Sequence, residues 1–255
     1  MKNKMCPLVV MILSIVAVAT GLRAGPPSAD DVGDAGSFGH AAQYMGAASG
    51  FITLSTDPCP SPTPTPAPPS TANNSQCFML NPAPAPTSWT ADDICRIKLP
   101  KKATRTIIYP VLNFFYDYQL ENTTAVPVPN ALFEYSATLS IESDVLLDPS
   151  IIDPNTGDPA NGKLVFQFGP NRVRDDRSMN PGDRARNRLT FARAGNAGIN
   201  KAQLVSSGLS QSVVDALFAS AMTIRMNVRG SDRLVTNISP SVPTSITCNM
   251  RLFGD

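Results

Sequence analysis

From Trp89 onward, apolar and polar residues alternate with a period of two over much of the chain. The clearest case is ALFEYSATLSIES (131–143), where Phe133, Tyr135 and Leu139 fall on one face. Glu134 and Ser136 fall on the other face. This alternation is typical of an antiparallel strand that packs on a core on one side and meets water on the other.

The same alternation recurs in other segments, which are separated by turn-rich stretches such as DPNTGDPANG and NPGD. The recurring segments are DICRIKLP (93–100), RTIIYPVLNFFYDYQL (105–120), KLVFQF (163–168), RLTFARA (188–194), TIRMNVRG (223–230) and TSITCNMRLFG (244–254). Several short strands with frequent turns predict a mainly β protein, an antiparallel β-sandwich or jelly-roll-like domain. The 42% apolar composition is enough for one such core.

One region has a helical pattern, NKAQLVSSGLSQSVVDALFAS (200–220). Gly208 stands where a helix often ends, and Ser212 with Asp215 matches a capping box for a second helix. Two helices joined at a glycine superficially suggest a DNA-binding helix-turn-helix. However, residues 210–220 contain no Lys or Arg to meet phosphates, so we expect no nucleic-acid partner. The segment is predicted to be a short helical crossover that covers an open end of the sandwich.

The chain begins with the three parts of a secretory signal peptide, which we place at residues 1–24. Lys2 and Lys4 precede an uncharged run from Pro7 to Leu22, and Ala19 or Ala24 offers a cleavage point. The run is shorter than the roughly 20 residues that a spanning helix needs. We therefore expect a secreted, periplasmic or cell-surface protein, with no membrane-spanning segment after the signal.

The proline tract DPCPSPTPTPAPPSTANNSQC raises the question of domain count. Residues 25–56 are rich in small residues and could hold one strand, but they are too few to bury a core alone. The tract is therefore predicted to be a Pro/Thr-rich loop (57–90) within one domain rather than a linker between two. The β-sandwich domain is predicted to span 91–255.

Four cysteines remain after the signal, and their even number predicts disulfides in an oxidising compartment: Cys59, Cys77, Cys95 and Cys248. We favour pairing Cys59 with Cys77, which would close the proline loop, over the alternative of Cys77 with Cys95, which would leave it open. Cys95 and Cys248 both fall on apolar faces, so a bond between them would join the first and last strands of the core. No Cys-x-x-Cys pair is present, and no metal site is expected.

Enzyme motifs are sparse. The only histidine, His40, stands in a small-residue segment without a recognisable partner, and no Gly-x-Ser-x-Gly elbow is present. The segment from Asp153 to Asp158 partly resembles a calcium loop, but turn chemistry explains its Asp, Asn and Gly residues equally well. We therefore predict a protein that is not an enzyme, with no catalytic residues and no cofactor.

The strongest charge feature is NRVRDDRSMNPGDRARNRLTFAR, in a chain whose net charge is only +1. Its arginines are Arg172, Arg174, Arg177, Arg184, Arg186, Arg188 and Arg193. They could contact an anionic partner such as an acidic glycan. Alternatively, they could pair with nearby aspartates on a solvated hairpin, each pair contributing under about 1 kcal/mol.

Two functions fit these observations. The first is an exported, non-catalytic structural or adhesive protein that associates with itself at the cell surface. The second is an extracellular ligand-binding module for carbohydrate or another anionic partner. Self-association and an anionic glycan are accordingly the candidate partners.

Overall fold

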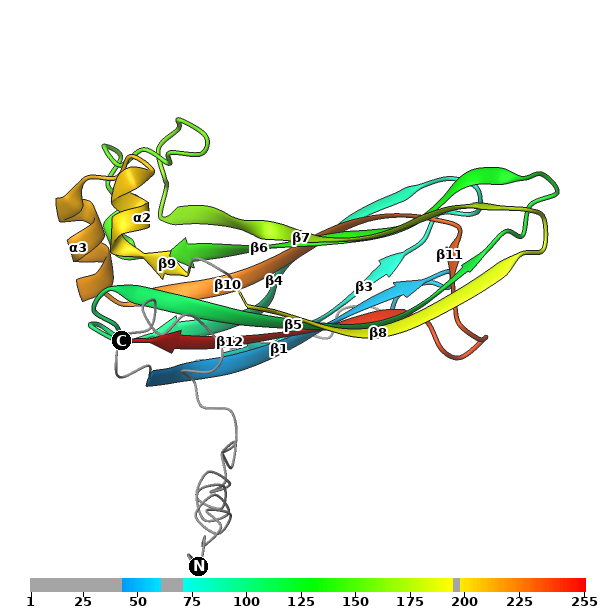
Figure 1. The fold of residues 1–255 in the computed structure, drawn as a ribbon, viewed down its shortest axis with the longest axis horizontal. Helices are drawn as coiled ribbons and strands as arrows, with labels where there is room; N and C mark the ends of the chain where they lie inside the picture. The colour runs from blue at the N-terminus through cyan, green and yellow to red at the C-terminus, as the bar shows by residue number, and fades with distance from the viewer. Residues whose placement is uncertain (1–42, 61–70, 195–197) are drawn as a thin grey trace, which may run out of the picture.

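The protein is a two-layer β-sandwich that is elongated along its strands (Figure 1). The structure is a computed structural model that describes residues 43–60, 71–194 and 198–255. The predicted signal peptide, His40 and the centre of the proline tract lie outside the described residues. The predicted fold class, a β-sandwich with short helices, is confirmed.

The first sheet, sheet A, is built around the long strand β5. Its strands are β1 (Gln43–Ser55), β3 (Ser75–Met79), β5 (Ile107–Glu121), β8 (Arg184–Ala194), β9 (Ile199–Asn200), β11 (Val235–Thr236) and β12 (Thr244–Gly254). β12 pairs with β5 on one side and with β1 on the other. Because the same β5 residues pair with β8 and β12, β8 lies on the opposite side of β5 and forms an edge.

The second sheet, sheet B, runs in the order β2, β4, β10, β6 and β7. The bounds are β2 (Thr71–Asn73), β4 (Thr87–Leu99), β6 (Val128–Glu142), β7 (Lys163–Met179) and β10 (Met222–Arg233). β7 forms one edge of this sheet. The chain passes directly from β7 to β8, so it crosses from sheet B to sheet A at that side of the sandwich.

The alternating apolar residues fill the space between the two sheets, as the pattern predicts. Phe133, Tyr135 and Leu139 on β6 are buried, and so are Phe114 and Tyr118 on β5. Leu189 is an exception because its side chain is 46% exposed, although its alternation predicted burial. It stands on the edge strand β8, where fewer neighbours cover a side chain.

The sandwich begins earlier than residue 91, where the sequence placed its start. β1 lies inside sheet A, between β12 and β3, and both β2 and β3 come from the predicted Pro/Thr-rich loop. The segment Gln43–Ser55 is therefore part of the core: Ile52 and Leu54 are fully buried. Its many small residues hid this role in the sequence.

The two sheets come into backbone contact at Gly50 on β1. A Cβ atom placed on Gly50 would lie 2.3 Å from the carbonyl oxygen of Ile94 on β4. Such a distance leaves no room for any side chain. β4 is irregular at this point, because its register with β10 shifts and Asp93 has φ 54°. Glycine at residue 50 therefore permits the close approach of sheet A and sheet B.

Two helices cover one end of the sandwich, as predicted (Figure 1). They are α2 (Lys201–Ser206) and α3 (Gln211–Ala219), and the 3-10 turn η3 (Asp144–Leu147) lies near α3. The cap of α3 differs from the prediction: the hydroxyl of Ser210, not of Ser212, accepts a hydrogen bond from the Val213 amide. Leu217 and Phe218 are buried against the core.

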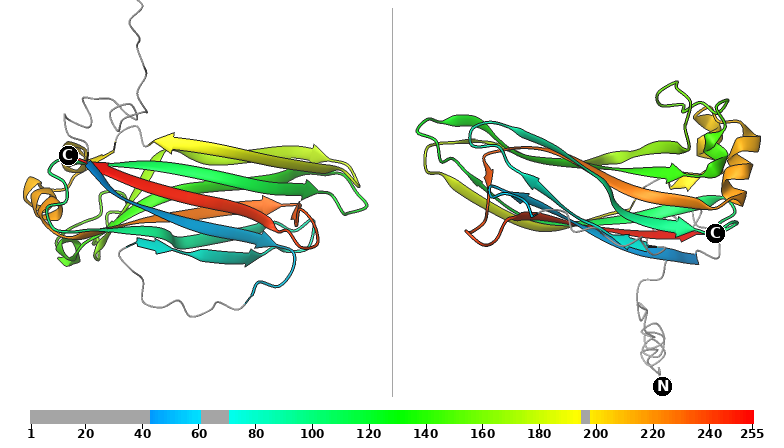
Figure 2. Two further views of the ribbon diagram at one scale, coloured as in Figure 1. Left: turned by 90° about the horizontal axis from the view of Figure 1, so that it is seen from below. Right: turned by 180° about the vertical axis from the view of Figure 1, so that it is seen from behind.

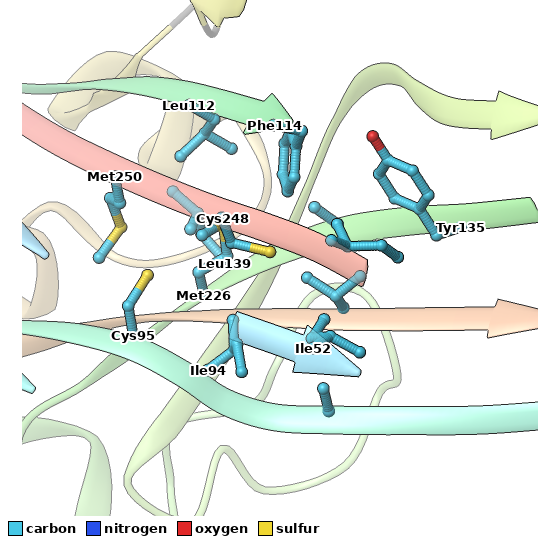
Figure 3. Packing of buried hydrophobic residues seen from close by; sticks show 14 of the residues in the cluster. Ile52, Ile94, Cys95, Leu112, Phe114, Tyr135, Leu139, Met226, Cys248 and Met250 are labelled. Atoms are coloured by element: carbon cyan, nitrogen blue, oxygen red, sulfur yellow. The ribbon is translucent and has the colours of Figure 1, made fainter. Parts of the chain in front are cut away.

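The cysteines divide into one disulfide and two free thiols. Cys59 and Cys77 are bonded, which confirms the predicted closure of the proline loop at its base. The predicted bond between Cys95 and Cys248 is wrong for this structure, because both are free. They do point into the core from opposite sheets, as their alternation predicted (Figure 3). Burial raises the pKa of each thiol, so neither is a ready nucleophile.

The contact at Gly50 predicts a specific sensitivity. Gly50→Ala should lower the free energy of unfolding by roughly 3 kcal/mol or more, because the backbone of β4 cannot give way to a methyl group. Thr53→Ala, on the outward face of the same strand, is the control and should cost less than about 1 kcal/mol. Urea unfolding followed by fluorescence measures both. Equal effects of the two substitutions would refute the role of Gly50.

The thiols can be counted chemically in a chain that begins at residue 25. A thiol reagent should label no cysteine in the native protein, because both free thiols are buried and held neutral. In denaturant without reductant it should label two. Complete absence of labelling in denaturant would mean that Cys95 and Cys248 are oxidised after all.

Candidate functional site

The arginine-rich segment forms the two edge strands β7 and β8 on one side of the sandwich. Arg184, Arg186 and Arg188 lie on the outer face of sheet A, next to outward residues of β5. Arg172 and Arg174 lie on the outer face of sheet B, next to Glu134 of β6. The two groups therefore face opposite directions, and the structure does not bring the arginines together as one patch.

Within the arginine-rich segment, each arginine whose side chain is described has a carboxylate partner. Arg172 and Arg174 share Glu134, at 2.6 and 3.1 Å. On β8, Arg184 pairs with Glu121 at 2.7 Å. Also on β8, Arg186 bonds Asp117 through Nε (2.9 Å) and Nη2 (2.7 Å). On β7, Arg177 bonds Asp175. Arg188 is the weakest case, 3.9 Å from Asp117, and Arg193 belongs to the residues whose side chains are not described.

These pairs change the interpretation of the arginine charges that the sequence alone suggested. Asp117 and Glu121 come from β5 and Glu134 from β6, so the sequence window around the arginines did not contain them. The sequence does show these carboxylates on the polar faces of the predicted strands. It does not show which strands lie beside β5 and β6, so their arginine partners could not be identified. Paired charges on edge strands also hinder pairing with another chain, which is a usual protection of exposed edges. The predicted contact role of the arginines stays a prediction.

Side-chain hydrogen bonds link β5, β7 and β8 on the side of the sandwich where β7 and β8 form the edges. The Tyr118 hydroxyl on β5 donates to the Asp175 carboxylate on β7 and accepts from the Asn187 amide on β8 at 3.3 Å. Arg177 holds the same carboxylate through Nε at 2.8 Å. Burial, together with Asp175, raises the pKa of Tyr118, so the phenol remains a neutral donor. One arginine of the segment thus has a structural role.

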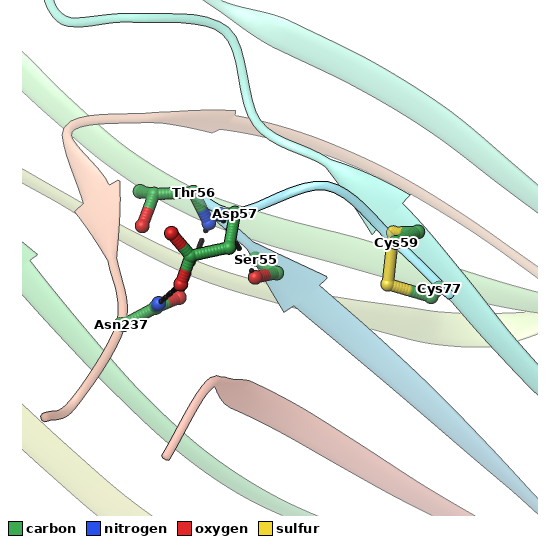
Figure 4. Close-up of a disulfide and its surroundings, with 6 residues drawn as sticks. All are labelled: Ser55, Thr56, Asp57, Cys59, Cys77 and Asn237. Atoms are coloured by element: carbon green, nitrogen blue, oxygen red, sulfur yellow. Dashed lines mark hydrogen bonds between the residues drawn. A yellow bond between two sulfur atoms is a disulfide. The ribbon is translucent and has the colours of Figure 1, made fainter. Parts of the chain in front are cut away.

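A cleft of about 670 Å³ opens at the end of the sandwich opposite the helices. Gln119, Glu121 and Arg184 line it from sheet A, and Thr236 and Asn237 line it from the β11 region. Its wall is fixed by polar bonds: the Asn237 amide donates to Asp57 at 2.8 Å, and the Asn237 side-chain oxygen accepts from the Thr56 amide at 3.1 Å. The Cys59–Cys77 disulfide anchors the chain just beyond Asp57 (Figure 4).

The outer face of sheet A carries a band of aromatic, amide and small side chains, which we call the aromatic–amide strip. Figure 2 (left) looks onto β8, β5, β12 and β1, in yellow, green, red and blue. The strip comprises Tyr44, Ala47, Ser49 and Phe51 of β1, Thr247, Asn249, Arg251 and Phe253 of β12, and Val111, Asn113 and Phe115 of β5. Arg251 is its one charged member.

The strand register places the members of the strip in rows. Phe51, Thr247 and Phe115 are direct neighbours across three strands. In the next row, Asn249 stands opposite Asn113. Tyr44 packs edge-on against Phe253, with ring centres 5.8 Å apart. The rings of Tyr44 and Phe51 are 61% and 40% exposed, so part of their surface faces solvent.

The outer face of sheet B has a different chemical character. Arg225 bonds both Asp93 (2.6 Å) and Glu142 (2.7 Å), and Arg96 also pairs with Asp93. A separate group of ion pairs, formed by Glu134 with Arg172 and Arg174, lies farther along β6 and β7. The outer face of sheet B therefore carries ion pairs on several strands. On sheet A the ion pairs lie on β8 and the second half of β5, and the aromatic–amide strip beside them presents rings and amides with one charged member.

The carboxyl group with the largest upward pKa shift is sealed inside the sandwich. Asp232 on β10 is 1% exposed, and burial raises its pKa to about 7. The Trp89 indole donates to it at 2.5 Å and the Glu134 amide at 3.3 Å, which offsets part of the shift. Without access to solvent, Asp232 is placed to support the fold rather than to act on a substrate.

The acidic loop after η3 is organised as a turn. The Asp153 carboxylate accepts from the backbone amide of Asn155 at 2.8 Å and from its side-chain amide at 3.1 Å. Asp153 is also buried. Local hydrogen bonding of this kind accounts for the Asp and Asn residues that resembled part of a calcium loop.

Comparisons with known proteins add no family to this geometry. No protein-family model, curated protein or solved structure matches the chain. Within the described part of the chain, no helix has both the length and the apolar character to cross a membrane. A function must therefore be argued from the surface itself.

Asp232 predicts a pH dependence of stability. Its pKa in the folded state is raised above the ordinary value of about 3.9, so its protonated form favours folding. The free energy of unfolding should fall as pH rises from about 4 to about 7, by up to roughly 1.4 kcal/mol per pH unit from this group. Asp232→Asn should remove that slope in urea unfolding. Identical slopes in parent and variant would contradict the assignment.

Proposed function

We propose that the protein is an exported, non-catalytic structural or adhesive protein that acts by surface contact. The observation that carries the proposal is the contrast between its two broad faces. Sheet B carries ion pairs across its outer strands, whereas the aromatic–amide strip of sheet A presents rings and amides with one charged member. A large surface with exposed rings marks a place of contact on a soluble protein. The disulfide at the base of the proline loop supports an oxidising, extracytoplasmic setting.

Self-association at the cell surface is one form that this contact can take. The edges formed by β7 and β8 do not favour it, because paired arginines and carboxylates occupy both strands. The aromatic–amide strip is the better candidate surface, since only Arg251 would have to lose its hydration there.

The second candidate is an extracellular ligand-binding module for carbohydrate or an anionic partner. The cleft beside Gln119 favours it, because its volume lies within the usual range of ligand sites and its lining combines apolar and polar groups.

Adhesion of coated beads tests the proposed function. Beads that carry a chain beginning at residue 25 should clump together or adhere to surfaces coated with extracellular polysaccharide. Contacts made by the strip should persist at about 0.5 M salt, because such ionic strength screens charges but not ring contacts. Contacts made by the arginines should weaken with salt, and with the triple substitution R184S, R186S and R188S.

Phe51→Ala beads should lose adhesion that depends on the strip, while Leu147→Ala beads should keep it. Leu147 is an exposed apolar side chain near the helices and serves as the matched control. Failure of the parent beads to adhere to either surface at any salt concentration would refute a structural or adhesive role.

A further inference from the structure

We propose that the aromatic–amide strip binds an uncharged linear glycan. This inference rests on the proposed function and names the chemical class of its partner. It starts from the three kinds of side chain that share the outer face of sheet A: exposed rings, paired amides and small residues between them.

The rings provide stacking surfaces at a regular spacing. Phe51 and Phe115 lie on β1 and β5, with β12 between them. Neighbouring strands are about 4.8 Å apart, so the two rings are roughly 10 Å apart, about the length of a disaccharide unit. The guanidinium of Arg188 lies over the Phe115 ring, 5.1 Å from its centre, so at β5 a ligand meets this guanidinium plane stacked on the ring. A pyranose offers an apolar face of C–H groups that suits such a surface.

The amides provide hydrogen bonds suited to hydroxyl groups. Asn113 and Asn249 are direct neighbours in the row beside the two phenylalanines. Each amide can both donate and accept, as a sugar hydroxyl can, and neither group carries a charge that would require an ionic partner. A neutral ligand can approach this row without removing water from several ions, which would be costly.

A ligand stacked on the row of Phe51 and Phe115 lies across β1, β12 and β5. The outward face of β5 offers a second direction at right angles to this row, toward the cleft. The outward residues of β5 continue from Asn113 and Phe115 through Asp117 to Gln119, which lines the cleft. Six residues of strand correspond to about 20 Å, the length of several sugar units. The Asp117 carboxylate along this path is held by two bonds from Arg186, so the path crosses a compensated charge.

Other occupants fit the strip less well. A stable interface with a second copy is usually rich in apolar residues and poor in Ser and Ala at its centre. The strip has Ala47, Ser49 and the two asparagines there. An acidic glycan would find a better surface among the arginines of sheet B and of the edge strands.

The test uses a chain that begins at residue 25 and isothermal titration with neutral hexasaccharides built from glucose, xylose, mannose or N-acetylglucosamine. Hexagalacturonate is the acidic comparison. At least one neutral hexasaccharide should bind, with an affinity that changes little between 0.05 and 0.5 M salt (about one decade of ionic strength). Phe51→Ala and Asn249→Ala should each weaken binding roughly tenfold or more. Leu147→Ala should leave it unchanged, and the thermal midpoint of each variant confirms that it folds.

Three results would overturn the inference, and they differ from failure of the proposed function. Adhesion of beads without binding of any neutral hexasaccharide would leave the adhesive role standing and refute the glycan class. Binding of hexagalacturonate alone, lost in the triple arginine variant, would assign the partner to the arginines. A concentration-dependent dimer that Phe51→Ala dissolves would make the strip a surface for a second copy.

Discussion

The backbones of β1 and β4 touch at Gly50, and this contact sets the relation between the two sheets. The carbonyl group of Ile94 on sheet B lies so close to Gly50 on sheet A that no side chain fits at residue 50. With the spacing fixed there, the alternate residues of β5, β6, β10 and β12 pack between the sheets and form one core. Cys95 and Cys248 lie in this core beside the contact. Cys95 follows Ile94 in the chain, and Cys248 is the register partner of Gly50.

The same alternation that fills the core decides what the two broad faces present. On sheet B, the outward positions hold arginines and carboxylates that pair with one another. On sheet A, the outward positions of β1, β12 and the first half of β5 hold Phe51, Asn113, Asn249 and other residues with few charges, while β8 and the second half of β5 hold ion pairs. The arginine-rich segment follows the crossing from β7 to β8, so its charges are divided between these faces. A contact surface on the strip of sheet A is consistent with this division, because the ion pairs of that sheet lie beside the strip, on β8 and the second half of β5.

Local patterns predicted the parts of the fold that depend on local residues. The alternation in 131–143 is a strand with its apolar side inward, and the helical segment near Gly208 covers one end of the sandwich. The predicted closure by Cys59 and Cys77 also holds, since both lie close in sequence.

Features that depend on distant pairing could not be predicted in this way. Glu134 as the partner of Arg172 follows only from the register of β6 with β7. The strip likewise requires three strands, β1, β12 and β5, to be adjacent, although they lie far apart in the sequence. The small residues of 43–55 gave little sign of a central strand, because they allow close packing of the two sheets and do not form a clear alternation of bulky apolar residues.

Nuclear magnetic resonance of the labelled protein during titration with a neutral hexasaccharide tests the central claim, that contact is made by the outer face of sheet A. The account predicts that the side-chain amide signals of Asn113 and Asn249 shift, together with backbone signals of β1, β12 and β5. Signals of β4, β6 and β10 should stay in place. Shifts confined to sheet B or to the junction of β7 and β8, or no shifts at saturating ligand, would contradict it.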